Sequence, residues 1–285
     1  MNKQKIALLT DSCADIPQDL KEKYDIYIVP LKVRFGNEEY LDGVTITPKE
    51  VYERQKNELP QTSLPDGALI EDTFNKIKQK GYEKVIAVHL SGGLSGTFNL
   101  VRLLASEQNE LEIAVFDSIN GSLGIGLIVL QLAKYIEQDY TFEQLVDIAP
   151  KLISNTTVFF CVDTLEYLQK GGRIGKISAM AGTLLQIKPI LSFAEDGQLT
   201  SVDKVRGRKL ALEKMAKMIE KLYSGNGAYN IALANGDCIE EMNMLKNRIL
   251  QTLPNPNFTF ESEIDCTLAS YVGPHLLGIG LQILP

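Results

Sequence analysis

One unit of the sequence limits the kind of fold that this chain can adopt. A short apolar segment, residues 85–90, runs directly into the loop SGGLSGT at residues 91–97, and a helical pattern begins near Phe98. The segment is typical of a buried strand. Similar strand-like segments alternate with helical ones through residue 150. Because strands separated by helices form parallel sheets with both faces covered, the first half of the chain predicts an α/β sheet domain.

The second half has a different pattern. After about residue 155 the regular alternation of strands and helices changes, and Asp196-Gly197 is typical of a hairpin turn. We therefore expect two domains, residues 1–155 with a parallel sheet and residues 156–285 with a mixed one. The predicted strands are 5–10, 26–35 (broken at Pro30), 84–89, 112–116, 157–162, 190–193, 230–234, 258–264 and 277–284. The predicted helices are one starting at Asp15 and those at 47–58, 66–80, 98–106, 123–137, 179–187, 208–223 and 239–250.

The loop after the 84–89 strand has the chemistry of an anion site. Glycine lets the backbone approach a ligand closely. Hydroxyl groups, free N–H groups and the dipole of the following helix all favour a negative charge. The candidate residues are Ser91, Gly92, Gly93, Ser95 and Thr97. An alternative interpretation is that the loop only caps the helix.

Composition excludes several functional classes. A net charge of −7 and a pI near 5.1 argue against nucleic acid as the main partner. No apolar run is long enough for a membrane span or a signal peptide, so we expect a cytoplasmic protein. The four cysteines form no CxxC pair and there are only two histidines, so we expect neither disulfides nor a metal site.

Several short stretches occur in a characteristic order. They are TDS at 10–12, TSLP at 62–65, LSGGLSGT at 90–97, LEYLQKGGRIG at 165–175, IKPIL at 187–191, KVRG at 204–207 and GPHLLG at 273–278. This ordered set resembles the DegV family over essentially the whole chain. Members of that family bind a long-chain fatty acid, and several are the binding subunit of a bacterial fatty acid kinase.

The resemblance implies a Rossmann-like domain, a second α/β domain with a mixed sheet, and a palmitate-like acyl chain buried between them. By the same match, Thr62 and Ser95 are expected to bind the carboxylate, with Ser63 beside them. A separate kinase subunit is the expected protein partner, and no cofactor is expected. Tyr271 stands where the family has a histidine, and His275 where a glycine is common. Either side chain is therefore expected to take the part of that histidine.

A basic, glycine-rich stretch follows at residues 170–176. It lacks the glycine spacing of a phosphate-binding loop. Two interpretations remain: a turn with solvated side chains, or a basic rim that meets a kinase subunit or attracts an anionic ligand. The rim would comprise Arg173, Lys176 and Arg206, with Lys188 beside them.

These patterns favour a protein that binds a fatty acid without catalysing a reaction itself. His89 lies in a predicted buried strand, and Cys13 has no base at a useful spacing. We therefore assign no catalytic residue. The alternative is an enzyme that acts on a small phosphorylated substrate at the loop 91–97.

Overall fold

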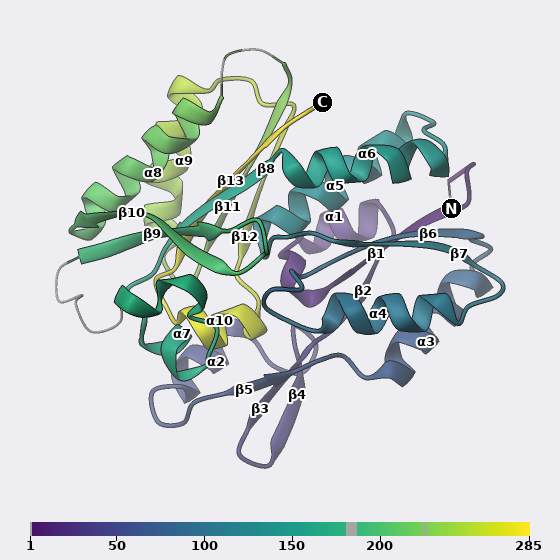
Figure 1. Cartoon of the computed structure of the whole chain (residues 1–285), viewed down its shortest axis with the longest axis horizontal. Coiled ribbons are helices and arrows are strands. Elements are labelled where there is room, and N and C mark those ends of the chain that lie inside the picture. Colours follow the sequence, from purple (N-terminus) through teal and green to yellow (C-terminus); the bar gives the residue numbers. More distant parts are fainter. Residues whose placement is uncertain (1, 181–186, 224, 226) are drawn as a thin grey trace.

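The computed structural model describes residues 2–180, 187–223, 225 and 227–285. Its first layer is a parallel sheet in the order β2-β1-β6-β7 (Figure 1). The strands are β1 (Ile6–Asp11), β2 (Ile26–Val29), β6 (Lys84–His89) and β7 (Glu112–Asp117). One face is covered by α3 (Gly67–Gln79) and α4 (Thr97–Ser106), and the other by α5 (Leu123–Glu137) and α6 (Phe142–Ser154). This confirms the predicted parallel sheet with helices on both faces.

The second layer is a mixed sheet in the order β10-β9-β8-β13-β11-β12. Only β11 and β12 run parallel, and the other neighbours are antiparallel. The strands are β8 (Thr156–Cys161), β9 (Ile187–Phe193), β10 (Leu199–Arg206), β11 (Tyr229–Asn235), β12 (Phe258–Glu263) and β13 (Leu277–Ile283). Its outer face is covered by α8 (Arg208–Leu222) and α9 (Ile239–Thr252). The proposed domain boundary falls between α6 and β8.

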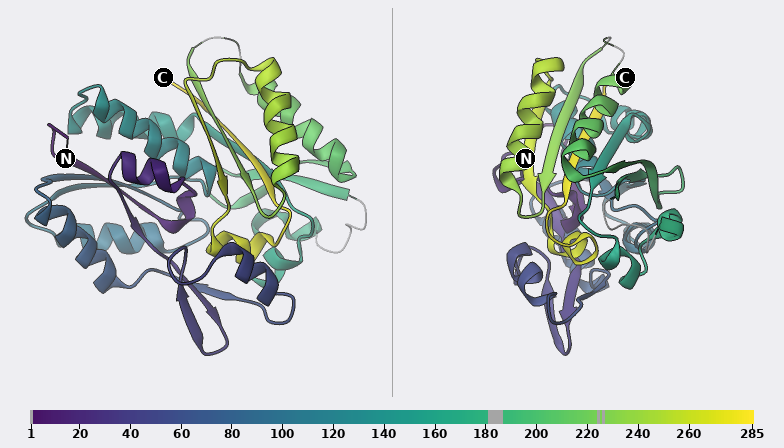
Figure 2. Two further views of the ribbon diagram at one scale, coloured as in Figure 1. Left: turned by 180° about the vertical axis from the view of Figure 1, so that it is seen from behind. Right: turned by 90° about the vertical axis from the view of Figure 1, so that its left-hand side faces the viewer.

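A small antiparallel sheet, in the order β4-β3-β5, projects beside the two main sheets (Figures 1 and 2). Its strands are β3 (Lys32–Phe35), β4 (Glu38–Leu41) and β5 (Gln61–Ser63). Helix α10 (Cys266–Val272) packs against this sheet, α2 (Pro48–Arg54) and α7 (Glu166–Lys170). The remaining elements are α1 (Gln18–Lys23) and two 3-10 turns, η1 (Ser12–Ala14) and η2 (Gly175–Met180).

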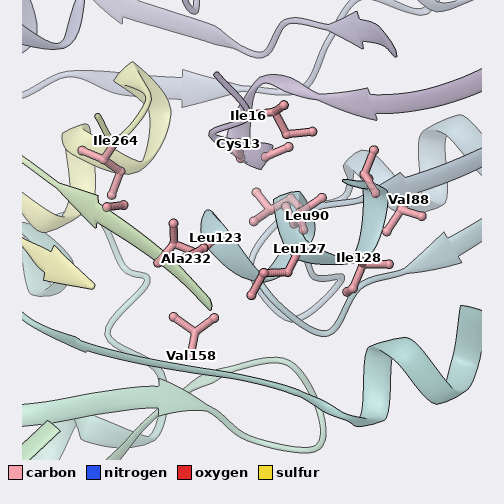
Figure 3. Packing of buried hydrophobic residues seen from close by; sticks show 14 of the residues in the cluster. Cys13, Ile16, Val88, Leu90, Leu123, Leu127, Ile128, Val158, Ala232 and Ile264 are labelled. Carbon is pink, nitrogen blue, oxygen red and sulfur yellow. The ribbon is translucent and has the colours of Figure 1, made fainter. Parts of the chain in front are cut away.

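Helix α5 is the element that joins the two main sheets. Thirteen of its residues are buried, from Leu123 through Ile136, with exposed positions confined to its end. A helix that is apolar all round must be buried on every side. It packs on β1 and β6 of the first sheet and on β8, β11 and β13 of the second. In Figure 3 its side chains Leu123, Leu127 and Ile128 lie between Val88 and Leu90 on one side and Val158 and Ala232 on the other.

Several predicted helix boundaries hold because local chemistry sets them. Thr47 and Glu50 form a reciprocal capping box at α2, with Pro48 at the first helical position, although the helix ends at Arg54 rather than Glu58. The prediction that Asp15 caps a helix was wrong. Asp15 has φ +48 and ends the turn η1, and α1 begins at Gln18 instead.

Other elements were not predicted from sequence. They are β4, β5, α6, α7, α10 and β10, although Thr141 and Gln144 form a capping box at α6 that gives it a sequence signal. The predicted helix 179–187 lies mostly outside the described residues. Across the described chain, the helices fall short of the length or the hydropathy that spanning a bilayer would demand.

Gly126 lets α5 approach its neighbours closely. A Cβ at this position would lie 2.7 Å from the carbonyl oxygen of Ala14 and 2.8 Å from Cζ of Phe260. We expect Gly126→Ala to destabilise the fold by about 1–3 kcal/mol through overpacking, despite the better helix propensity of alanine. Urea unfolding measures this difference. Gly67→Ala in α3 is the matched control, because its Cβ would make an ordinary 3.7 Å contact with Leu104. Equal stability of the two variants would contradict this role of Gly126.

Candidate functional site

A cavity of about 230 Å³ lies between the two main sheets. The first sheet contributes the residue after β6, Leu90, and the second contributes residues of β8, β9, β10, β11 and β13. Strand β5, the loop before α4, the start of α5, α7 and α10 also contribute to the wall. Most of the lining is apolar, including Leu31, Leu94, Leu123, Val158, Phe160, Leu168, Phe193, Leu199, Ile264, Leu268, Val272 and Leu276. The cavity is therefore suited to a hydrophobic ligand.

Several hydroxyl groups also line this wall, and those of Ser122 and Thr267 donate to the carboxylates of Asp15 and Asp42. Thr62 and Ser63 come from β5, Ser95 from the loop before α4, and Tyr271 from α10. The hydroxyls of Thr62 and Tyr271 are 2.5 Å apart and hydrogen-bond each other. Strand β5 holds Thr62 in place because it pairs with β3, where Val33 is its partner. The structure thus brings Thr62 and Ser95, which are 33 positions apart in the sequence, to one cavity.

The loop 91–97 turns Ser95 toward the cavity. The N–H groups of Leu94 and Ser95 both donate to the carbonyl of Ser91, which makes a tight turn. The Ser95 hydroxyl lies 2.9 Å from the Thr97 hydroxyl and accepts from the Thr97 N–H at 3.3 Å. Gly96, which also lines the cavity, is the N-cap of α4 and leaves that position without a capping side chain. The positive end of the α4 dipole therefore lies beside Ser95, where it favours an anion.

The first residues of the same loop contact the second sheet instead. Ser91 is fully buried, and its hydroxyl donates to the carbonyl of Gly197 at 3.0 Å. A Cβ on Gly93 would lie only 2.5 Å from the carbonyl carbon of Gly197. The Gly92 N–H donates to Asp117 at 3.0 Å. Ser91, Gly92 and Gly93 thus fasten the loop to the β9–β10 hairpin and to β7, and they are not among the lining residues. Their part in binding stays a prediction.

The residues of the predicted basic rim differ in whether they reach the cavity. Arg173 lines the cavity, with its guanidinium carbon 5.0 Å from the centre of the Tyr271 ring. Lys176 pairs with Asp196 at 2.8 Å, and Lys188 with Asp163 at 2.9 Å. Arg206 is the last residue of β10. Arg173 is therefore the member of the predicted rim that reaches the cavity wall.

Tyr271 and His275, the two expected substitutes for the family histidine, lie in different environments. Tyr271 is buried, lines the cavity and bonds Thr62. His275 is exposed, has φ +62, and its N–H donates to the carbonyl of Gly236. The structure places the Tyr271 side chain, and not that of His275, at the cavity.

Sequence analysis missed the part of the wall that comes from the second sheet. Phe160, Ala234 and Gly278 lie side by side on β8, β11 and β13, with Gly278 paired to both of the others. In each strand these residues alternate with residues that face α8 and α9, so they point to the inner face of the sheet. The strand order is needed to recognise that these three positions are neighbours.

Other polar residues that the sequence singled out hold the loops in place. The Asp11 carboxylate accepts from the N–H groups of Cys13 at 3.0 Å and Leu90 at 2.8 Å. It also hydrogen-bonds Nδ1 of His89 at 3.0 Å, and both side chains are fully buried. Asp117 accepts from the N–H groups of Gly92 and Ile119. Both aspartates therefore hold the backbone of neighbouring loops in place.

A second cluster of polar groups lies at the N-terminus of α10. The Cys13 sulfur and one carboxylate oxygen each of Asp42 and Asp265 lie within 4.8 Å of one another, a spacing that would suit metal ligands. The Asp42 carboxylate caps the N-terminus of α10: it accepts hydrogen bonds from the N–H groups of Cys266 and Thr267 and from the Thr267 hydroxyl. Burial raises the pKa of Asp15, which accepts from the Asp265 N–H, to about 7. Burial also raises the pKa of Asp265.

The family model described as "Uncharacterised protein, DegV family" matches residues 5–283. A DegV domain-containing protein of Clostridium acetobutylicum is 38% identical over 276 residues, which cover 97% of this chain and 98% of that protein. A DegV family protein from Thermus thermophilus, described by its fatty acid binding, has 29% identity and a TM-score of 0.92, with all of both chains covered. A stearic acid-binding protein from Eubacterium ventriosum has 27% identity and a TM-score of 0.88, with 98% of each chain covered.

The carboxyl cluster at α10 makes stability depend on pH. Asp15 has an ordinary pKa of 3.8, and in the folded chain its pKa is about 7. The unfolded chain therefore releases this proton first, so the free energy of unfolding falls as pH rises from about 4 to about 7. We expect Asp15→Asn to reduce that fall. Urea unfolding at several pH values measures it, with Asp19→Asn on the exposed side of α1 as control. Parallel pH profiles for wild type and Asp15→Asn would contradict the assignment.

Proposed function

Because the chain belongs to the DegV family, we propose that it binds a long-chain fatty acid in the cavity between its two sheets. The observation that carries the proposal is the composition of the cavity wall, which is mostly apolar and also carries the hydroxyls of Thr62, Ser95 and Tyr271, with Ser95 beside the N-terminus of α4. A fatty acid has the same division into a long apolar chain and a single anionic end. The related proteins from Thermus thermophilus and Eubacterium ventriosum are described as binding fatty acids, which supports the proposal.

The acyl chain supplies most of the affinity in this proposal. Each buried methylene contributes about 0.8 kcal/mol, so a palmitate-like chain of about sixteen carbons contributes roughly 12 kcal/mol before the costs of association. A carboxylate that entered the cavity without hydrogen-bond donors would cost several kcal/mol. Thr62, Ser95 and Tyr271 can donate to it, and hydrogen bonds to a charged acceptor are the stronger kind. The hydroxyls therefore fix which end of the ligand lies at this part of the wall.

A binding role without catalysis is the form of the proposal that the site supports. The Thr62 hydroxyl bonds that of Tyr271, and the Ser95 hydroxyl bonds that of Thr97, so these hydrogen bonds run to other hydroxyls and not to a basic side chain. A small phosphorylated substrate would leave the apolar wall formed by Phe160, Phe193 and Leu268 without a partner. A fatty acid accounts for both parts of the wall.

The finer part of the proposal is that the chain presents its ligand to a separate kinase subunit. In that reaction a carboxylate oxygen attacks the γ-phosphorus of ATP, the bond from that phosphorus to ADP breaks, and an acyl phosphate forms. Arg173 at the cavity wall and Lys176 nearby in sequence support an electropositive approach for such a partner.

Loss of either of two hydroxyls tests the carboxylate site. We expect Thr62→Val and Ser95→Ala each to weaken binding of palmitate by about 1–3 kcal/mol, because a charged acceptor loses a donor. Binding of the methyl ester, which carries no charge, should change much less. Displacement of a fluorescent fatty acid measures both ligands. The matched controls are Thr259→Val on β12 and Ser106→Ala at the end of α4, both exposed.

Two results would contradict this site. One is equal affinity of the wild type for palmitate and its methyl ester. The other is an equal loss for acid and ester in both variants, which would indicate a packing role. Absence of any acyl chain in organic extracts of the purified protein, together with no uptake of added palmitate or oleate, would refute fatty-acid binding itself.

Kinase presentation is tested separately. With ATP, a fatty acid and the catalytic subunit of a fatty acid kinase, we expect acyl phosphate, trapped by hydroxylamine, to form only when this chain is present. Lys176→Ala should lower that rate at least threefold and leave fatty-acid affinity unchanged, because its ammonium is half exposed outside the cavity. Lys151→Ala on α6 is the control, since Lys151 is exposed. No product above the level without this chain would exclude the kinase role and leave binding intact.

A further inference from the structure

The inner face of the second sheet carries little side-chain volume along β13 and β11. Strand β13 turns Gly278 and Gly280 toward α5. On the neighbouring strand β11, their partners are Ala234 and Ala232. On the other side, β8 contributes Phe160 beside Gly278 and Val158 beside Gly280. Two adjacent rows, one at Gly278 and one at Gly280, therefore form a shallow trough in the sheet.

The first row is open to the cavity. Gly278, Ala234 and Phe160 all line it. A Cβ on Gly278 would lie 3.6 Å from Cδ1 of Leu123 and 3.7 Å from Cβ of Phe160, which are ordinary contacts. A methyl group at this position fits without strain and takes up room that the cavity now holds.

The second row is closed by α5. A Cβ on Gly280 would lie 2.8 Å from Cδ1 of Leu127 and 3.4 Å from Cβ of Leu123. Leu127 is fully buried and rests on the glycine. Among the described residues of this row, Val158 lines the cavity, whereas Gly280 and Ala232 do not. The cavity is thus stopped along the sheet where Leu127 packs on Gly280.

We infer that Gly278 and Leu127 select the length of the acyl chain, with the bare Gly278 row receiving its last carbons and Leu127 stopping it. The inference rests on the proposed function. The hydroxyls of Thr62, Ser95 and Tyr271 take the carboxylate, whereas the Gly278 row offers only apolar atoms from Phe160, Ala234 and Leu123. The methyl end of the ligand therefore belongs over Gly278, and this chain takes acids up to the length that Leu127 allows.

The first test narrows the trough. The dissociation constants of saturated acids of twelve, fourteen, sixteen and eighteen carbons are measured for Gly278→Ala and for Gly67→Ala, whose Cβ meets only Leu104 at 3.7 Å. We expect Gly278→Ala to weaken the longest acid that the wild type binds well by at least fourfold, the equivalent of one methylene. The shortest acid should bind as in the control, so the preferred length decreases.

The second test lengthens the trough. Leu127→Ala removes the side chain that covers Gly280, and we expect the preferred length to increase by at least one methylene. Because Leu127 is buried, thermal unfolding is recorded first, and Leu127→Val replaces the variant if it is unfolded at the assay temperature. The expected shift is then smaller and in the same direction.

The outcomes separate the inference from the proposed function. Failure of the wild type to bind any acid of the series overturns the proposed function. Binding by the wild type, with a Gly278→Ala length profile that superimposes on that of Gly67→Ala, overturns the inference alone. A uniform loss across all lengths in Gly278→Ala also overturns it, since that result indicates damage to the site as a whole. Opposite shifts in the two variants support it.

Discussion

Helix α5 packs between the two main sheets and holds them together. A helix buried on all sides needs an apolar partner on each, and β1 and β6 supply one while β8, β11 and β13 supply the other. The helix fills the space between the sheets along most of its length. Near Leu123, at the start of the helix, side chains leave part of the space between the sheets open, and this space is the cavity.

The same arrangement explains why the hydroxyls and the apolar wall meet. Ligands of parallel sheets bind at the carboxyl ends of the strands, where Leu90 and the loop 91–97 follow β6. The loop is held there from two sides, by Asp117 of the first sheet and by Gly197 of the β9–β10 hairpin. Helix α10 brings the Tyr271 hydroxyl into hydrogen-bonding distance of Thr62 on β5. The site is thus assembled from segments whose positions depend on contact between the two sheets.

Sequence reasoning succeeded where local patterns decide structure. The β6 strand, the α5 helix and the cap at Thr47 follow from apolar runs and from side chain–backbone hydrogen bonds within a few residues. It failed at Asp15, whose positive φ and burial are imposed by its contacts with Ser122 and Asp265, far away in the sequence. It also left open which residues of the loop 91–97 face a ligand. Ser91 and Ser95 look equivalent in sequence, and only docking onto Gly197 separates them.

The parallel sheet of the first half, the mixed sheet of the second half and the family follow from the amino-acid sequence, because strand and helix periodicity and ordered motifs are local properties of the chain. The small antiparallel sheet and the shape of the cavity depend on contacts between distant segments. Gly278 and Ala234 are small residues like many others until β13 pairs with β8 and β11 and α5 covers the next row. Free volume belongs to no single residue, since it is what remains after distant segments have packed.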